Sequence, residues 1–165
     1  MQNIIITGAS HGIGRALTKK LSKKYHIINI DIVENKMDKV DFYKCDLSDK
    51  SKLLKTIEKI KTNIDSLYAL INNAALFSSK SLEKQTLEEW ENIISINLTA
   101  PYILSKEFAS MLKQSKGHII NISSTRASMS EAGTEAYSSS KGGISSLTHA
   151  LAITLSPDVK VNSIS

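Results

Sequence analysis

The sequence predicts an α/β fold built on a doubly wound parallel sheet, with three layers α/β/α. Short β-branched runs alternate with longer amphipathic segments along the chain. The strand runs lack a clear polar alternation, which is typical of strands covered on both faces. Right-handed crossovers between parallel strands then place helices on both sides of the sheet. The length of 165 residues fits one domain, residues 1–165.

The elements follow in a regular order. Strands are predicted at residues 4–6, 26–31, 40–45, 66–71, 118–123 and 159–165. Helices are predicted at residues 12–24, 49–61, 86–112 and 134–155. The second helix has Ser48 as its expected N-cap, and its expected apolar face is formed by Leu53, Leu54, Ile57 and Ile60.

Two of these helices carry terminal signals. Thr86 and Glu89 have the spacing of a capping box at the start of the third helix. Ser156-Pro157 is expected to end the fourth, because the residue before a proline avoids the helical conformation.

The composition is that of a soluble globular protein, with 41% hydrophobic and 22% charged residues. No apolar run reaches the roughly 18 residues that a membrane span needs, and the N-terminus has no signal-peptide pattern. The single cysteine, Cys45, fits a reducing compartment. We therefore expect a cytoplasmic protein that does not bind membranes.

The net charge of +5 is carried mostly by lysines at spacings typical of solvated helix faces. A basic balance can indicate nucleic-acid binding, but the chain has no arginine cluster and no interleaved aromatic stripe. We predict no nucleic-acid partner.

A glycine-rich turn follows the first strand. Residues 7–14 read Thr-Gly-Ala-Ser-His-Gly-Ile-Gly, with glycines at 8, 12 and 14. Such glycines allow a tight turn and a close approach of a pyrophosphate to the backbone, while the following helix offers N–H groups and a partial positive charge. Between the first strand and the first helix of an α/β chain, this turn predicts nucleotide binding rather than a merely structural turn.

Polar residues also follow the next strands. Asp31 ends the second strand, where a carboxylate accepts hydrogen bonds from the adenosine ribose and repels a 2′-phosphate, which favours NAD over NADP. The alternative is that Asp31 only caps a turn. Asp46-Leu47 follows the third strand as a candidate adenine site, and residues 72–75, Asn-Asn-Ala-Ala, follow the fourth. Both stretches also have the composition of ordinary loops.

Tyr137 and Lys141 are four residues apart on a predicted helix and so share a face. An ammonium beside a phenol favours the phenolate and makes the tyrosine usable as a general acid/base. Tyr102 and Lys106 have the same spacing, but only Tyr137 is preceded by a hydroxyl at a strand end, Ser124. We expect Ser124 to orient a substrate carbonyl and Tyr102 to have a packing or surface role.

Asn97 precedes Pro101 by four residues. Because proline lacks an N–H, the carbonyl of residue 97 is expected to lose its helical partner and to hold an ordered water that links Lys141 to solvent. The alternative is a simple kink in the helix.

Together, the glycine turn, residues 72–75 and the spacing of the catalytic candidates resemble the motifs of classical short-chain dehydrogenases/reductases. Members of this family have a Rossmann fold. The resemblance spans essentially the whole chain. It implies a catalytic set of Asn97, Ser124, Tyr137 and Lys141. It also implies cofactor contacts from Thr7, Gly8, Ser10, His11, Gly12, Ile13, Gly14, Asp31, Asp46, Leu47, Asn73, Ala74 and Ala75, in addition to Tyr137 and Lys141. No metal site is expected.

The sequence departs from the family pattern in two places. Residues 125–128, Thr-Arg-Ala-Ser, lack a glycine that is common after the serine. After residues 161–165, the family runs on into a Pro-Gly turn, a substrate-binding loop, a last helix and a seventh strand, so this sequence lacks the last helix-strand unit.

Two hypotheses follow. The first is an oxidoreductase that transfers a hydride between NAD(H) and a small secondary alcohol or ketone. The second is a truncated, catalytically inactive NAD-binding protein or fragment. The helices that carry Asn97 and Tyr137 resemble those that pair into a four-helix interface in the family, so we expect a homodimer or homotetramer.

Overall fold

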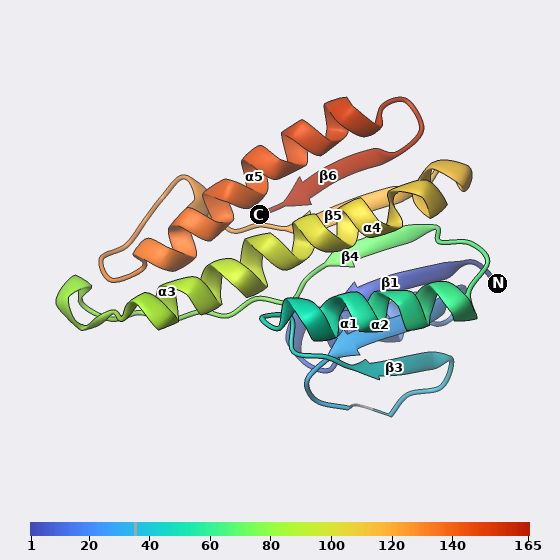
Figure 1. Ribbon diagram of the computed structural model, residues 1–165, viewed down its shortest axis with the longest axis horizontal. Helices are drawn as coiled ribbons and strands as arrows, with labels where there is room; N and C mark the ends of the chain where they lie inside the picture. Colours follow the sequence, from blue (N-terminus) through green and yellow to red (C-terminus); the bar gives the residue numbers. More distant parts are fainter. Residues whose placement is uncertain (35) are drawn as a thin grey trace.

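A single six-stranded sheet forms the centre of the computed structural model, which describes residues 1–34 and 36–165 (Figure 1). All neighbouring strands are parallel, and their order is β3-β2-β1-β4-β5-β6. The strands are Asn3–Thr7 (β1), His26–Asp31 (β2), Val40–Lys44 (β3), Ala69–Asn72 (β4), His118–Ile122 (β5) and Lys160–Ile164 (β6). The strand order reverses between β1 and β4. In such sheets, ligands bind near this reversal, outside the carboxyl ends of the strands. The predicted doubly wound fold is confirmed.

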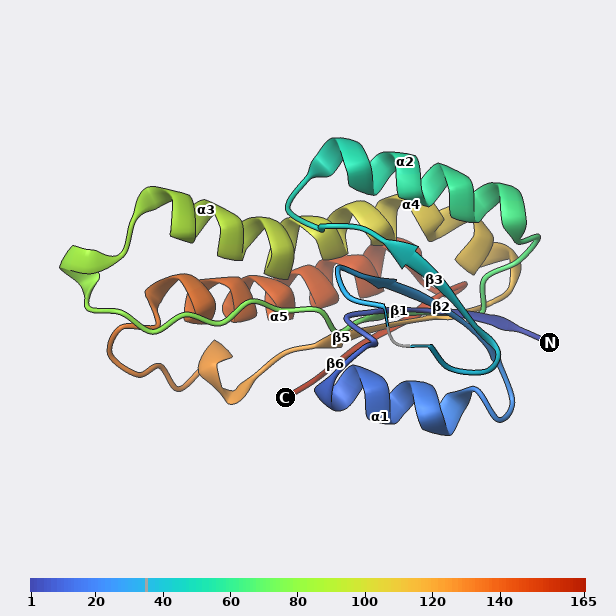
Figure 2. The ribbon, with the colours of Figure 1, turned by 90° about the horizontal axis from the view of Figure 1, so that it is seen from below.

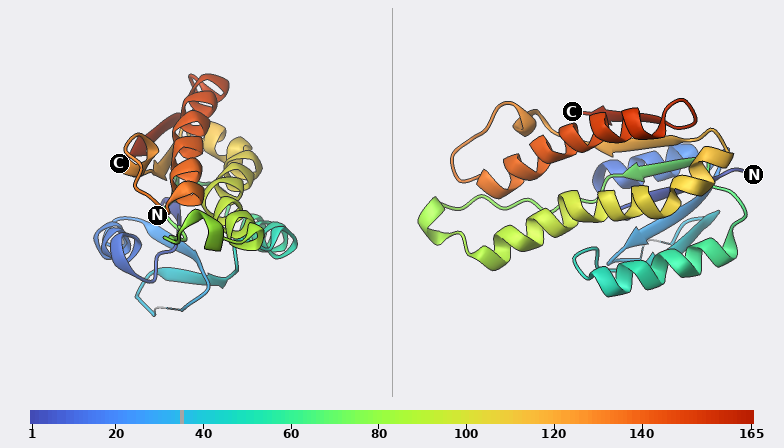
Figure 3. Two further views of the ribbon diagram at one scale, coloured as in Figure 1. Left: turned by 90° about the vertical axis from the view of Figure 1, so that its left-hand side faces the viewer. Right: turned by 45° about the horizontal axis from the view of Figure 1, so that its top comes forward.

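The helices lie on both faces of the sheet, with α1 on one side and α2 and α4 on the other (Figure 2). They are Gly12–Leu21 (α1), Lys50–Asn63 (α2), Leu87–Ile94 (α3), Ala100–Gln114 (α4) and Glu135–Leu155 (α5). The described residues also form the 3₁₀ turns Leu82–Lys84 (η1) and Thr125–Ala127 (η3) and the π-turn Ser95–Thr99 (η2). Helix α5 packs beside α3, α4 and η2, and the N-terminal ends of α3 and α5 project beyond the sheet (Figure 3). Within the described residues no helix is both long and apolar enough to cross a membrane.

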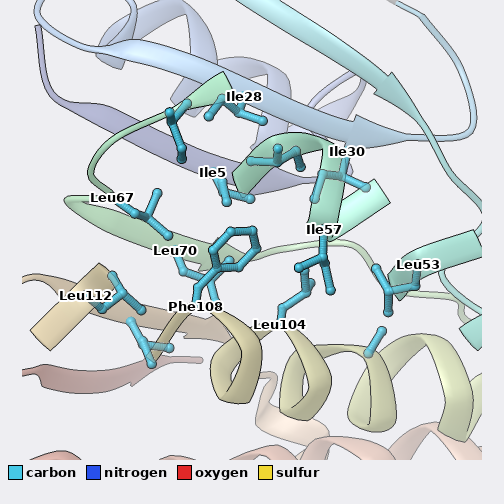
Figure 4. Close-up of a cluster of buried hydrophobic side chains, with 14 of the residues drawn as sticks. Ile5, Ile28, Ile30, Leu53, Ile57, Leu67, Leu70, Leu104, Phe108 and Leu112 are labelled. Atoms are coloured by element: carbon cyan, nitrogen blue, oxygen red, sulfur yellow. The ribbon is translucent and has the colours of Figure 1, made fainter. Parts of the chain in front are cut away.

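The isoleucines of β1 alternate between the two faces of the sheet, as side chains of a strand must. Ile4 and Ile6 pack on the α1 side, whereas Ile5 enters a larger cluster with residues of α2, α4 and α5. Phe108 of α4 lies at the centre of this cluster and is fully buried (Figure 4). Each such side chain stabilises the fold by about 1.5–3 kcal/mol, so the core holds the strand ends at fixed positions.

The start of α2 differs from the prediction. Asp49, not Ser48, is the N-cap, because an Asp49 oxygen accepts a hydrogen bond from the Lys52 N–H at 3.0 Å. Ser48 instead donates its hydroxyl to the carboxylate of Asp46 at 2.7 Å. Leu54 was also placed wrongly on the apolar face: it is 45% exposed, since it points about 100° away from its buried neighbour Leu53.

The predicted long helix at residues 86–112 is interrupted. Its start is confirmed, since Thr86 and Glu89 form a reciprocal capping box. Between α3 and α4, however, the chain forms the π-turn, in which the Ala100 N–H bonds to the carbonyl of Ser95. Pro101 follows directly in the first turn of α4, where its missing N–H is tolerated. Such π-turns are frequent at functional sites, and this one contains Asn97.

Candidate active site

Two adjoining cavities open at the carboxyl edge of the sheet. The first, about 580 Å³, lies over the ends of β1, β2 and β3. The second, about 740 Å³, lies over the ends of β4, β5 and β6. Asn73 and Ala75 line both cavities, so an elongated ligand can extend from one to the other.

The glycine turn forms one wall of the first cavity, and each glycine has a distinct environment. Gly8 has φ +66°, and a Cβ atom there would lie 2.9 Å from the Cα of Ala74. A Cβ on Gly14 would overlap the carbonyl oxygen of Gly8, so this residue allows α1 to approach the sheet. Gly12 has φ +50° but open space beside it. A side chain at position 12 would fill this space. The space that glycine leaves open is expected of a site that holds a pyrophosphate.

The N-terminus of α1 also has features of a site for a pyrophosphate. His11 occupies the N-cap position without a side-chain capping bond among the described residues, and the first turn holds no acidic side chain. The first N–H groups of a helix have no partner within it, and they carry a partial positive charge. This end of α1 therefore fits a phosphate group.

Thr7 and Asn73 lock the glycine turn to the loop after β4. The Thr7 hydroxyl oxygen accepts the N–H groups of Asn73 and Ala74, both at 3.0 Å. The Asn73 amide donates in return to the carbonyls of Thr7 and Gly8, also at 3.0 Å. Thr7 is buried and lies behind the cavity wall, so the structure gives it a positioning role.

Asp31 lies at the rim of the first cavity, where backbone groups hold its carboxylate. It accepts N–H groups from Ser10 at 3.0 Å, Ile32 at 2.7 Å and Val33 at 3.3 Å. Ser10 itself is fully buried, and its hydroxyl donates to the carbonyl of Val33, so it too lies behind the wall.

The residues that follow β3 complete the lining of the first cavity. Asp46 and Leu47 line it next to Cys45, which is buried. One Asp46 oxygen accepts both the N–H and the hydroxyl of Ser48, at 2.9 and 2.7 Å. Among the described residues lining this cavity, Asp31 and Asp46 are acidic and none is Lys or Arg.

Tyr137 and Lys141 line the second cavity from α5 and share one face, as predicted. The Lys141 Nζ lies 5.5 Å from the centroid of the Tyr137 ring and donates to the Ile122 carbonyl at 2.7 Å. Lys141 is only 3% exposed, and this burial lowers its pKa from 10.5 to about 8. Its ammonium can therefore exchange a proton near neutral pH.

Ser124 joins them from the end of β5. Its hydroxyl oxygen accepts the Arg126 N–H at 3.2 Å, which leaves the hydroxyl proton available for donation into the cavity. The preceding Ser123 is buried, and its hydroxyl is directed to Lys141 O and Ser145 in α5. The side chains of Ser124, Tyr137 and Lys141 thus meet at one cavity.

Asn97 is buried beside this group and lines neither cavity. Its amide accepts the Leu76 N–H at 2.7 Å and donates to the Leu76 carbonyl at 2.9 Å and to the Ser140 hydroxyl at 3.0 Å. Ser140 in turn donates to the Tyr137 carbonyl at 2.7 Å. The side chain of Asn97 therefore joins the loop after β4 to the helix that carries Tyr137.

The family model of the short chain dehydrogenases matches residues 2–165. The chain belongs to the short-chain dehydrogenase family. An uncharacterized oxidoreductase of Thermotoga maritima is 41% identical over 92% of this chain, which spans 64% of that relative's length.

Solved structures of family members have the same fold. An apo SCOR enzyme from Clostridium thermocellum is 38% identical, with a TM-score of 0.93 over 99% of this chain and 71% of that one. A 4-hydroxyisoleucine dehydrogenase complexed with NADH is 32% identical, with a TM-score of 0.94 over 100% of this chain and 72% of that one.

Several residues at the two cavities of this short-chain dehydrogenase were not predicted from the sequence. Asn92 and Ile96 line the first cavity from α3 and the π-turn, and Ile120 and Ile122 line the second. Phe77 lies against Tyr137, with the ring centroids 5.0 Å apart. None has a sequence signal of its own, because each joins the site only through packing. Tyr102 is 49% exposed on α4, in agreement with its predicted surface or packing role.

Proposed function

We propose that the protein is an NAD-dependent oxidoreductase that interconverts a secondary alcohol and a carbonyl compound. The observation that carries this proposal is the continuous edge formed by the two cavities. The glycine turn lies at one side, and the Ser124, Tyr137 and Lys141 side chains lie at the other. We place the phosphates of the dinucleotide at the start of α1 and its reactive ring beside Tyr137, because Asn73 and Ala75 line both cavities.

The residues around the turn fit the adenosine half of the cofactor. Gly12 and the start of α1 would hold the pyrophosphate, Asp31 the ribose hydroxyls, and Asp46 and Leu47 the adenine. We favour NAD because a 2′-phosphate would face two carboxylates with no Lys or Arg among the described lining residues. NADH is expected to bind more tightly than NADPH in a fluorescence titration, and equal affinities would contradict this preference.

When bound, the nicotinamide supplies or accepts the hydride, and the protein handles the proton. In the reducing direction, the hydroxyls of Ser124 and Tyr137 both donate to the substrate carbonyl oxygen and hold the carbonyl in place. As the carbonyl carbon gains the hydride, the Tyr137 O–H bond breaks and its proton forms the O–H bond of the alcohol. The alcohol leaves, and Tyr137 remains as the phenolate.

Lys141 would restore that proton. Its ammonium is buried beside the Tyr137 ring, and its pKa of about 8 allows it to release and regain a proton near neutral pH. An ordered water held at the Asn97 carbonyl would link Lys141 to solvent. In the oxidising direction the same groups act in reverse, with Tyr137 as the base.

Turnover with NADH and a panel of ketones tests this proposal, with Tyr137→Phe as the variant. The loss of the acid/base hydroxyl is expected to lower kcat by about 10²–10⁴-fold, while NADH affinity stays near that of the unmodified protein. Equal turnover in both proteins would contradict the role of Tyr137. NADH binding without turnover in either would identify the alternative, a catalytically inactive NAD-binding protein.

We further propose that the protein acts as a homodimer in which α4 and α5 of two copies pair. Both helices carry exposed apolar side chains, Tyr102 at 49% and Ile153 at 68% exposure. Pairing would remove such side chains from water, which is favourable.

A further inference from the structure

Phe77 lies directly beside the proposed acid/base and outside both cavity linings described above. Its ring and that of Tyr137 meet edge to face, at 5.0 Å between centroids and 84° between planes. The side chain is nevertheless 58% exposed. Much of Phe77 is therefore open to a ligand beside Tyr137.

The segment that carries Phe77 is fixed at both ends. On one side, Asn97 binds both the N–H and the carbonyl of Leu76. On the other, the Lys80 N–H donates to the Gly133 carbonyl at 3.1 Å, and the Lys80 ammonium pairs with Glu89. Phe77 thus lies on a short stretch between two anchors, which places its ring in advance of ligand binding.

The second cavity has the chemistry of an apolar binding site with one polar corner. Apolar side chains line most of it: Ile13, Leu17, Ile71, Ile120, Ile122 and Ile164. Among its described lining residues Lys141 has the one charged side chain, and its Nζ is directed to the Ile122 carbonyl. Nearby Arg126 is paired with Glu131 and donates to the Met129 carbonyl. The described lining of this cavity is therefore suited mainly to an apolar group.

We propose that Phe77 determines substrate specificity by packing against an apolar substituent on the carbonyl carbon. The substrate class is then a ketone or secondary alcohol with an alkyl or aryl chain. This inference rests on the proposed function. Contact with an apolar chain removes the exposed part of the ring from water and fixes the carbonyl against Ser124 and Tyr137.

The test compares kcat/KM for 2-butanone and 2-octanone at saturating NADH. The unmodified protein is expected to prefer 2-octanone by about 10-fold or more, since apolar groups in a fitting pocket give discrimination of this order. Phe77→Ala is expected to reduce the preference to within about 3-fold, and Phe77→Leu to retain part of it. Leu82→Ala is the matched control, because Leu82 is another exposed apolar residue, in η1, and is expected to leave the preference unchanged.

A merely structural role for Phe77 predicts a different result, in which Phe77→Ala lowers kcat/KM for both ketones by the same factor. That outcome, or no preference in the unmodified protein, would overturn the inference while leaving the proposed function intact.

Calorimetry with unreactive amides separates the two proposals. In the presence of NADH, octanamide is expected to bind more tightly than butanamide, and Phe77→Ala is expected to remove the difference. If ketones are not reduced but this difference is found, the redox proposal fails and the apolar site stands. If the amides bind equally to the unmodified protein, the inference about Phe77 fails.

Discussion

Lys141 combines a charged side chain with an almost completely buried position. Its Nζ has a hydrogen bond to the Ile122 carbonyl and lies over the Tyr137 ring, but no carboxylate pairs with it among the described contacts. Burial of an ammonium without a counter-ion destabilises the folded state, and the lowered pKa of about 8 reflects this cost. A residue retained at such a cost is a candidate for function.

Replacement of Lys141 by Met is expected to stabilise the fold at neutral pH by about 1–3 kcal/mol and to lower activity. The lost bond to the Ile122 carbonyl offsets part of the gain. Denaturant unfolding of both proteins at neutral pH measures the difference, and a less stable Lys141→Met variant would contradict the argument.

The stability difference between Lys141→Met and the unmodified protein is expected to change with pH in a defined direction. Between pH values of about 8 and 10.5 the unfolded chain binds a proton at Lys141 that the folded chain has lost. The contribution of Lys141 to the free energy of unfolding therefore rises with pH across that window. As a result, the stability advantage of Lys141→Met over the unmodified protein shrinks. An advantage that grows over this window would show that the pKa of Lys141 is not lowered in the folded protein.

At the scale of elements, the β1–α1 unit shows how two of its glycines serve separate purposes. Gly14 allows the helix to pack against the Gly8 backbone, and a Cβ on Gly14 would also come within 2.6 Å of the Asn73 amide nitrogen. Gly12 has no neighbour within 4 Å of such an atom. One position therefore serves packing, and the other leaves space for a ligand.

Alanine at these two positions is expected to separate stability from cofactor binding. Gly14→Ala overlaps fixed backbone and is expected to cost about 2 kcal/mol or more in unfolding free energy. Gly12→Ala meets open space, and its positive φ costs about 1 kcal/mol, but its methyl group enters that space and is expected to weaken NADH binding about 10-fold or more.

Thermal unfolding and NADH titration of both variants measure these effects. Unchanged NADH affinity in a folded Gly12→Ala variant would contradict the proposed position of the pyrophosphate.

At the scale of the whole molecule, the sheet brings its functional loops to one edge, while α4 and α5 leave apolar side chains exposed on the outside. The chain spans 64% of the length of the Thermotoga relative and contains both cavities. Assembly through α4 and α5 would cover these side chains without blocking the edge of the sheet that holds the cavities.

The proposed dimer is expected to dissociate when Ile153, exposed on α5, is replaced by Lys, because a charge then has to be buried between the copies. Sedimentation velocity measures the change in mass. Leu54→Lys is the control, since Leu54 is 45% exposed on α2, away from the proposed interface. A monomeric unmodified protein, or equal masses for both variants, would contradict the proposal.

The sequence by itself determined the order of the elements, the glycine turn, the capping box at Thr86 and the shared face of Tyr137 and Lys141. These features depend on residues close together in the chain, where spacing fixes geometry. The choice between Asp49 and Ser48 as N-cap was missed, because Ser48 had a competing partner in Asp46 that its residue type does not reveal.

Only the tertiary structure decided how distant segments meet. The bonds from Asn97 to Leu76, the lock between Thr7 and Asn73, and the contact of Phe77 with Tyr137 join residues on different strands, loops and helices. Their partners are set by the parallel register and the packing of the core, and no local pattern specifies them. For that reason the residues of the proposed chemistry could be named from local motifs, whereas the contact of Phe77 with Tyr137, which we propose helps to select the substrate, is visible only in the fold.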